Sequence, residues 1–292
     1  FNTGNISTGD SDIIYLSPKT ADSENSKYSI AILGNNSLVK NYGNINLGEN
    51  AVGIYVVNNL TAAENHGNIT SLKNGAVGIY SDSGAGIINY GNISLYGSNV
   101  IGIAGRNSAK VVNYGIISVD GENAAGIYAT QSTAVENNGT INVSGNGSVG
   151  IVAPAEKIIN SGIINISDGA AMISPQNNYN IPELINAGII RVNGEFDAAG
   201  MKISIKPNLG TLQKSLLSGV DFTLNSVSIL ADSIKITDTV KILPDFTQGT
   251  NANVYKLENV FKAGSISTFG NKLSVESSSL TWEAVSEEED NQ

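Results

Sequence analysis

The chain has 292 residues, a net charge of −10 and no cysteine, which excludes disulfides and thiolate chemistry. Only two arginines are present, Arg106 and Arg191, so the clustered cations that bind nucleic acid or an anionic membrane surface are missing. Charged residues make up 14% of the chain, whereas Gly, Asn, Ile and Val are abundant. This composition is typical of short strands joined by tight turns, and no apolar run is long enough to predict a membrane-spanning helix.

Two motifs recur along the chain. Asn-x-Gly-x-Ile returns after 39 residues and then after 24, 24, 24, 24, 23 and 26 residues, so the first step predicts an insertion. An apolar-Gly-Ile-Tyr motif, as in Val52 to Tyr55, follows 12 or 13 residues after most of these asparagines. The asparagines of the first motif are Asn2, Asn41, Asn65, Asn89, Asn113, Asn137, Asn160 and Asn186.

Each repeat contains three short runs of alternating apolar and polar residues, without the helical period of 3.6. This pattern predicts an all-β fold, a right-handed three-sided parallel β-helix with about 24 residues per rung. The residues two before and four after each Asn are apolar and are predicted to point inward, and by parity so is the Asn. In the third run, we expect Val52 and Ile54 to point inward, and Ala51, Gly53 and Tyr55 outward.

An inward Asn column needs hydrogen-bond partners inside the solenoid. Each side-chain amide can donate to one neighbouring rung and accept from the other, so the column is predicted to form a continuous ladder. The Gly two residues after each Asn is expected to give the corner an unusual backbone conformation.

The regular pattern weakens after residue 200. Residues 1–200 hold 27 of the 32 glycines, whereas residues 201–292 hold five glycines, four of the six Phe and the only Trp, Trp282. We therefore predict regular rungs over 1–200, and degenerate rungs with an aromatic-rich closing region over 201–292. A short helix is expected over 211–218, and an acidic, solvated linker over 287–290.

The repeated phrases Asn-Tyr-Gly-Asn-Ile and Ala-Val-Gly-Ile-Tyr, over roughly residues 37–200, resemble the passenger repeats of the large fusobacterial autotransporter adhesins. The resemblance implies a type V secretion passenger, exported through an outer-membrane barrel outside this segment and displayed at the bacterial cell surface. It implies a monomeric stalk or binding surface for host-cell proteins, glycans or partner bacteria. It supplies no catalytic residue and no cofactor.

The alternative is a polysaccharide lyase or glycoside hydrolase, because such enzymes also use β-helices. They need clustered carboxylates, or carboxylates with a basic Lys or Arg, on one face across adjacent rungs. The closest pair, Asp120 and Glu122, lies in one turn and is interpreted as solvated. His66 is the only histidine, so neither a zinc site nor a Ser-His-Asp triad is expected. We predict no enzymatic activity and no metal site.

The candidate binding residues are tyrosines in two outward columns. One interpretation is that each ring of the second column covers the outward Gly two residues before it and shields the backbone. The other is that the columns are flat aromatic platforms for sugar rings or a protein partner. The columns are Tyr42, Tyr90 and Tyr114, with His66 in the intervening rung, and Tyr55, Tyr80 and Tyr128.

Overall fold

The structure of the chain is a computed structural model. It describes residues 1–11, 29–58, 61–82, 84–107, 110–130, 133–152, 157–174, 183–197, 202–206, 222–225, 227–236, 240–243, 255–268 and 273–275. The expected helix over 211–218, the acidic linker over 287–290 and Trp282 lie outside these residues.

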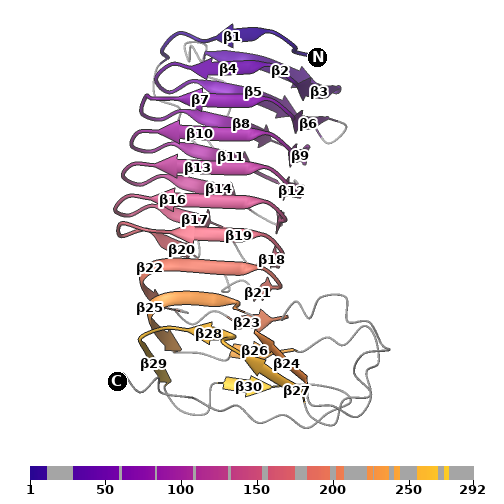
Figure 1. The fold of residues 1–292 in the computed structure, drawn as a ribbon. Coiled ribbons are helices and arrows are strands. Elements are labelled where there is room, and N and C mark those ends of the chain that lie inside the picture. Colours follow the sequence, from indigo (N-terminus) through magenta and orange to yellow (C-terminus); the bar gives the residue numbers. More distant parts are fainter. Residues whose placement is uncertain are drawn as a thin grey trace.

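Apart from β24 (Phe222–Asn225) and β27 (Tyr255–Glu258), the described strands form three long parallel sheets, which are the three sides of a solenoid whose rungs stack on one another (Figure 1). Sheet 1 contains β1 (Asn5–Ser7), β4 (Asn44–Leu47), β7 (Asn68–Ser71), β10 (Asn92–Tyr96), β13 (Ile116–Asp120), β16 (Thr140–Ser144), β19 (Ile163–Ile166), β22 (Ile189–Asp197), β25 (Ile229–Ile236), β28 (Phe261–Lys262) and β29 (Ser265–Thr268). Sheet 2 contains β2 (Ile30–Asn35), β5 (Val52–Val57), β8 (Val77–Asp82), β11 (Ile101–Gly105), β14 (Ala125–Ala129), β17 (Val149–Val152) and β20 (Ala171–Ser174). Sheet 3 contains β3 (Leu38–Asn41), β6 (Ala62–Asn65), β9 (Gly86–Asn89), β12 (Lys110–Asn113), β15 (Ala134–Asn137), β18 (Ile158–Asn160), β21 (Glu183–Asn186), β23 (Lys202–Ile205), β26 (Val240–Ile242) and β30 (Leu273–Val275).

The register of the sheets places the same motif position of neighbouring repeats side by side. Ile93, for example, pairs with Ile69 on one side and Ile117 on the other. Strands that are three apart in chain order, such as β4 and β7, thus lie side by side in the same sheet. The predicted all-β, three-sided parallel solenoid is confirmed.

The predicted inward columns of the first two runs are confirmed. The residues two before and four after the ladder asparagines are buried, and all belong to one apolar cluster. Since parallel strands lie about 4.8 Å apart, each Ile packs on the Ile of the next rung. The two columns are Val39, Ala63, Ile87, Val111, Val135, Ile158 and Leu184, and Ile45, Ile69, Ile93, Ile117, Ile141, Ile164 and Ile190.

The Asn ladder is also confirmed. The side-chain nitrogen of Asn89 donates to the Oδ1 of Asn113 at 2.8 Å, and that of Asn113 donates to the Oδ1 of Asn137 at 2.8 Å. The same nitrogen of Asn113 donates to the carbonyl of Gly115 at 3.2 Å. Each of these amides is therefore hydrogen-bonded although it is buried, as a polar group in a protein core requires. The ladder runs through Asn2, Asn41, Asn65, Asn89, Asn113, Asn137, Asn160 and Asn186.

The ladder ends where the repeat pattern is lost. Asn186 pairs in register with Ile205 of the next rung, which offers no amide. The side-chain nitrogen of Asn186 donates instead to the backbone carbonyls of Gly188, at 3.1 Å, and Ser228, at 3.2 Å. Beyond this point β23, β25, β26, β28, β29 and β30 continue sheets 1 and 3 in parallel. Among the described strands, β24 pairs only with β27.

The predicted faces of the third run were wrong in part. Ala51 is in the main core, whereas Val52 is in a second cluster on the outer side, together with Tyr55. A Cβ placed on Gly53 would lie 3.1 Å from the Cγ2 of the buried Ile69, so Gly53 also faces inward. Gly53 and Ile54 are thus consecutive inward residues, which breaks the alternation on which the prediction was based.

The expected role of the glycine after each ladder Asn was also wrong. These glycines do not have a positive φ angle; the left-handed residues lie at other turns, as at Asn50, Asn99 and Asn123. Glycine is required here because no side chain fits: a Cβ on Gly91 would lie 2.1 Å from the carbonyl oxygen of Gly67. Only Gly allows the two rungs to approach this closely.

Replacing Asn113 by Leu is expected to lower the free energy of unfolding by about 1–3 kcal/mol, because the amides of the rungs on both sides lose a partner inside the core. Urea unfolding followed by circular dichroism would measure the change. Asn92→Leu is the control, because its hydrogen bond to Asn68 is exposed to solvent and its loss leaves no buried amide without a partner. Equal stabilities for Asn113→Leu and the parent would contradict a stabilising ladder.

A second prediction compares a glycine whose Cβ position is blocked by neighbouring atoms with one whose Cβ position is free. A Cβ on Gly102 would lie 2.5 Å from both the carbonyl oxygen of Gly126 and the Cγ2 of Ile117, whereas a Cβ on Gly86 would meet its nearest atom at 3.9 Å. Gly102→Ala should therefore destabilise the chain by about 1–3 kcal/mol. Gly86→Ala should be neutral or slightly stabilising. Similar unfolding midpoints for the two variants would show that the rungs do not restrict residue 102.

Candidate functional site

The first tyrosine column forms a continuous stack at the corner between sheets 3 and 1. His66 lies between Tyr42 and Tyr90, with ring centroids 4.6 and 4.7 Å apart and interplanar angles of 12° and 14°. Tyr114 stacks on Tyr90 at 5.2 Å and 7°. The predicted stacking of His66 with its neighbours is confirmed, and Tyr42, His66, Tyr90 and Tyr114 are called the ring stack below.

The orientation of the ring stack limits what it can bind. Because each ring face within the stack is covered by the next ring, the stack presents ring edges to the solvent rather than faces. The three tyrosines are still 46–50% exposed. A sugar ring that packs on an aromatic face would find such a face only at the ends of the stack, for example on Tyr114, whose neighbouring rung carries Asn138. The ring stack is therefore not the flat platform that the sequence suggested.

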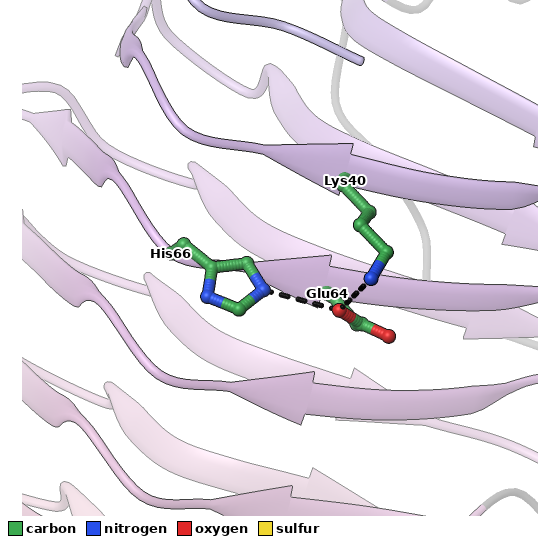
Figure 2. Close-up of polar contacts among 3 residues, drawn as sticks. All are labelled: Lys40, Glu64 and His66. Atoms are coloured by element: carbon green, nitrogen blue, oxygen red, sulfur yellow. Dashed lines mark hydrogen bonds and ion pairs between the residues drawn. The ribbon is translucent and has the colours of Figure 1, made fainter.

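A charged cluster lies beside the ring stack on the outer face of sheet 3. The Nζ of Lys40 lies 2.7 Å from the Oε2 of Glu64, and the Nε2 of His66 lies 3.0 Å from the same oxygen (Figure 2). The hydrogen bond from Lys40 lowers the pKa of Glu64, and burial, which acts in the opposite direction, does not cancel it. The same hydrogen bond raises the pKa of Lys40.

Sequence reasoning missed this cluster, although its signal was available. Lys40 and Glu64 each precede a ladder Asn, so the register places them in adjacent rungs. His66 follows Glu64 by two residues and turns its ring edge toward the carboxylate. Lys110 and Glu136 form a second pair on the same face, at 3.0 Å.

The second tyrosine column lies on the outer face of sheet 2 and is half-buried. The rings of Tyr55 and Tyr80 are 5.0 Å apart and tilted by 38°. The rings pack against a cluster of aliphatic side chains, and the Gly two residues before each Tyr faces the core instead. The rings thus shield side chains rather than glycine backbone. The cluster contains Val52, Val77, Ile101, Ala104 and Ala125.

An arginine completes the second column where the repeat lacks a tyrosine. Ala104 pairs in register with Tyr80 and Tyr128 and is fully buried. The Nη1 of Arg106 donates to the hydroxyl of Tyr80 at 3.0 Å. Burial opposes the charge of Arg106, but this hydrogen bond and the nearby Asp82 carboxylate outweigh it and raise the pKa of Arg106. Tyr55, Tyr80, Arg106 and Tyr128 are called the Tyr-Arg patch below.

The acidic pair that the enzyme alternative would use is exposed. Asp120 ends β13, and its carboxylate accepts a hydrogen bond from the hydroxyl of Ser144 at 2.5 Å. Glu122 lies in the following turn. Within the described ranges, no group of three or more His, Cys, Asp or Glu side chains is placed to hold a metal ion. In the same part of the chain, no helix has the length and apolar character needed to cross a membrane.

The fold defines the chain as a three-sided parallel β-solenoid with half-exposed aromatic columns on its sides. Residues 218–291 match the family model of the BigA beta sandwich domain. A search of the curated proteins gave no significant match, and neither did a search of the solved structures. The match suggests a surface adhesin-type protein with a β-solenoid stalk, located at the cell surface or outside the cell, and agrees with the resemblance to autotransporter passenger repeats.

The lowered pKa of Glu64 predicts a small loss of stability in acid. A carboxylate with a lowered pKa in the folded state stabilises the fold above its unfolded pKa of about 4.3, and this contribution disappears as the pH falls through the folded value. Glu64→Gln should remove this part of the pH dependence, about 0.5 kcal/mol for a pair open to solvent. Urea unfolding at pH 7 and pH 3 measures it, and Glu122→Gln is the exposed control. The same pH dependence in all three proteins would contradict the assignment.

Proposed function

We propose that this chain is part of the surface-displayed stalk of a bacterial adhesin, exported through an outer-membrane barrel, and that the stalk itself contacts a partner. The observation that carries the stalk function is the unbroken stacking of the rungs. Sheet 1 includes a path of ten parallel strands, which corresponds to a rod of roughly 45 Å. The match to an adhesin-like domain supports a non-enzymatic role of this kind.

A rod of this construction suits a stalk because every rung is bonded to both neighbours. The ladder adds a side-chain hydrogen bond between rungs to the backbone bonds of the three sheets, and the Ile columns add continuous packing. Stability is then approximately a sum of interactions between neighbouring rungs, so the rod stays ordered along its length without a globular core.

The Tyr-Arg patch is the part of the stalk that best fits a partner contact. Tyr and Arg are enriched at the centres of protein interfaces, because they offer a large contact area and several hydrogen-bond donors. The half-buried rings are already held by the aliphatic cluster, so binding would restrict little additional motion. We propose a host-cell surface protein or glycan, or the surface of a partner bacterium, as the target.

The contact is tested by changing Tyr55, Tyr80 and Tyr128 together to Ser and measuring the adherence of beads that carry the chain to epithelial cells. Loss of the patch should reduce adherence by about tenfold or more, since truncating a few central residues removes most of the binding energy. The same triple change at Tyr42, Tyr90 and Tyr114, which present ring edges, is the matched control.

Circular dichroism would confirm the fold of each variant. If the Ser variant fails to fold, a triple Leu variant keeps the apolar cover of the cluster and removes only the rings. A folded variant that adheres like the parent would show that the Tyr-Arg patch is not the contact. Parent beads that do not adhere would show that this segment acts only as a spacer.

A further inference from the structure

From β4 to β19, the outer face of sheet 1 is nearly free of charge, whereas the next strand, β22, exposes Arg191, Glu195 and Asp197. The strands β4, β7, β10, β13, β16 and β19 direct fifteen side chains outward, of which only Asp120 is charged. On the outer face of sheet 3, strands β3, β6, β9, β12 and β15 direct ten residues outward, and four of these are charged. The fifteen residues, called the amide face below, are Asn44, Asn46, Asn68, Thr70, Asn92, Ser94, Tyr96, Ile116, Ser118, Asp120, Thr140, Asn142, Ser144, Ile163 and Asn165.

The polar side chains of the amide face are held in order by hydrogen bonds between rungs. The side-chain nitrogen of Asn68 donates to the Oδ1 of Asn44 at 2.8 Å, and that of Asn92 to the Oδ1 of Asn68 at 3.2 Å. In the next column, Asn165 donates to Asn142 at 2.7 Å, and Asn142 to the hydroxyl of Ser118 at 3.0 Å. Side chains that are already ordered lose little rotamer freedom when a partner binds.

We propose that the amide face docks against the same face of a second copy of this chain. An amide is both donor and acceptor, and a ladder bond uses only part of its capacity, so an identical surface offers matching groups. Contacts of this kind between identical patches are the rule in symmetric dimers. The charge distribution favours this face, because two chains of net charge −10 repel each other and the amide face brings few like charges together.

The size of the amide face sets the strength of the association. Six strands at about 4.8 Å and five residues at about 3.3 Å give roughly 500 Å² per copy, and thus roughly 1,000 Å² in total. This area is at the lower limit for specific interfaces. The chain is therefore monomeric in dilute solution, and the face acts where many copies lie side by side and bind with avidity. The inference uses a different face from the Tyr-Arg patch and does not depend on the proposed function.

The experiment follows the clumping of beads coated with the chain at physiological salt. One variant carries Ser94→Glu with Thr140→Glu, and another carries Ser94→Lys with Thr140→Lys; the two positions are on the amide face, in rungs that are not adjacent. Ala62→Glu with Ala134→Glu, on the outer face of sheet 3, is the matched control. Circular dichroism verifies the fold of each variant.

Beads with the parent chain or the sheet 3 control should clump. Beads with either amide-face variant alone should clump at least about tenfold less, because like charges then face each other within a Debye length. A mixture of the Glu and Lys beads should clump again. Parent beads that stay dispersed would overturn the proposal. The amide face would then be a glycan-binding face if these beads bind immobilised dextran, and a solvated face if they do not. Equal clumping of all variants would place the association on another face.

Discussion

The hydrogen bond between the amides of neighbouring rungs constrains the rest of this structure. A buried Asn can be tolerated only if both its N–H groups and its oxygen find partners, and the repeat of about 24 residues supplies these partners at each step. A rung out of register would leave an amide unsatisfied on each side. The same register then brings the Ile columns into contact and forces glycine at the positions where the backbones approach most closely.

The outside of the solenoid follows the same period as the inside. Outward residues at the same position of successive repeats lie side by side on the surface, because the register that aligns the core residues also aligns them. The ring stack, the Lys40–Glu64 pair and the amide face are all consequences of this rule. These surface columns differ in solvent exposure. The rings of the Tyr-Arg patch are half-buried, whereas the ring stack exposes its ring edges.

The sequence predicted most of the fold, because alternation and a constant period determine the inward columns of the first two runs. The third run was predicted incorrectly at Ala51, Val52 and Gly53, because Gly53 has no side chain whose polarity reveals its direction and the break in alternation lies there. The tyrosine columns were found from their spacing. Their ring orientations depend on χ angles, which the repeat does not encode, and the hydrogen bond from Arg106 to Tyr80 uses an arginine that the other repeats do not share.

The end of the ladder at Asn186 has a consequence for how the length of such a protein changes during evolution. Between Asn41 and Asn186 each rung presents the same ladder amide and the same apolar columns to its neighbours, so a recombination event that inserts or removes one whole repeat joins cores that already fit. At Asn186 the amide binds a backbone carbonyl of a non-repeating segment, and Ile205 occupies the next ladder position. Unequal crossing-over is therefore tolerated on one side of this boundary and disfavoured on the other, so that the regular region can lengthen or shorten while the segment after it keeps its size.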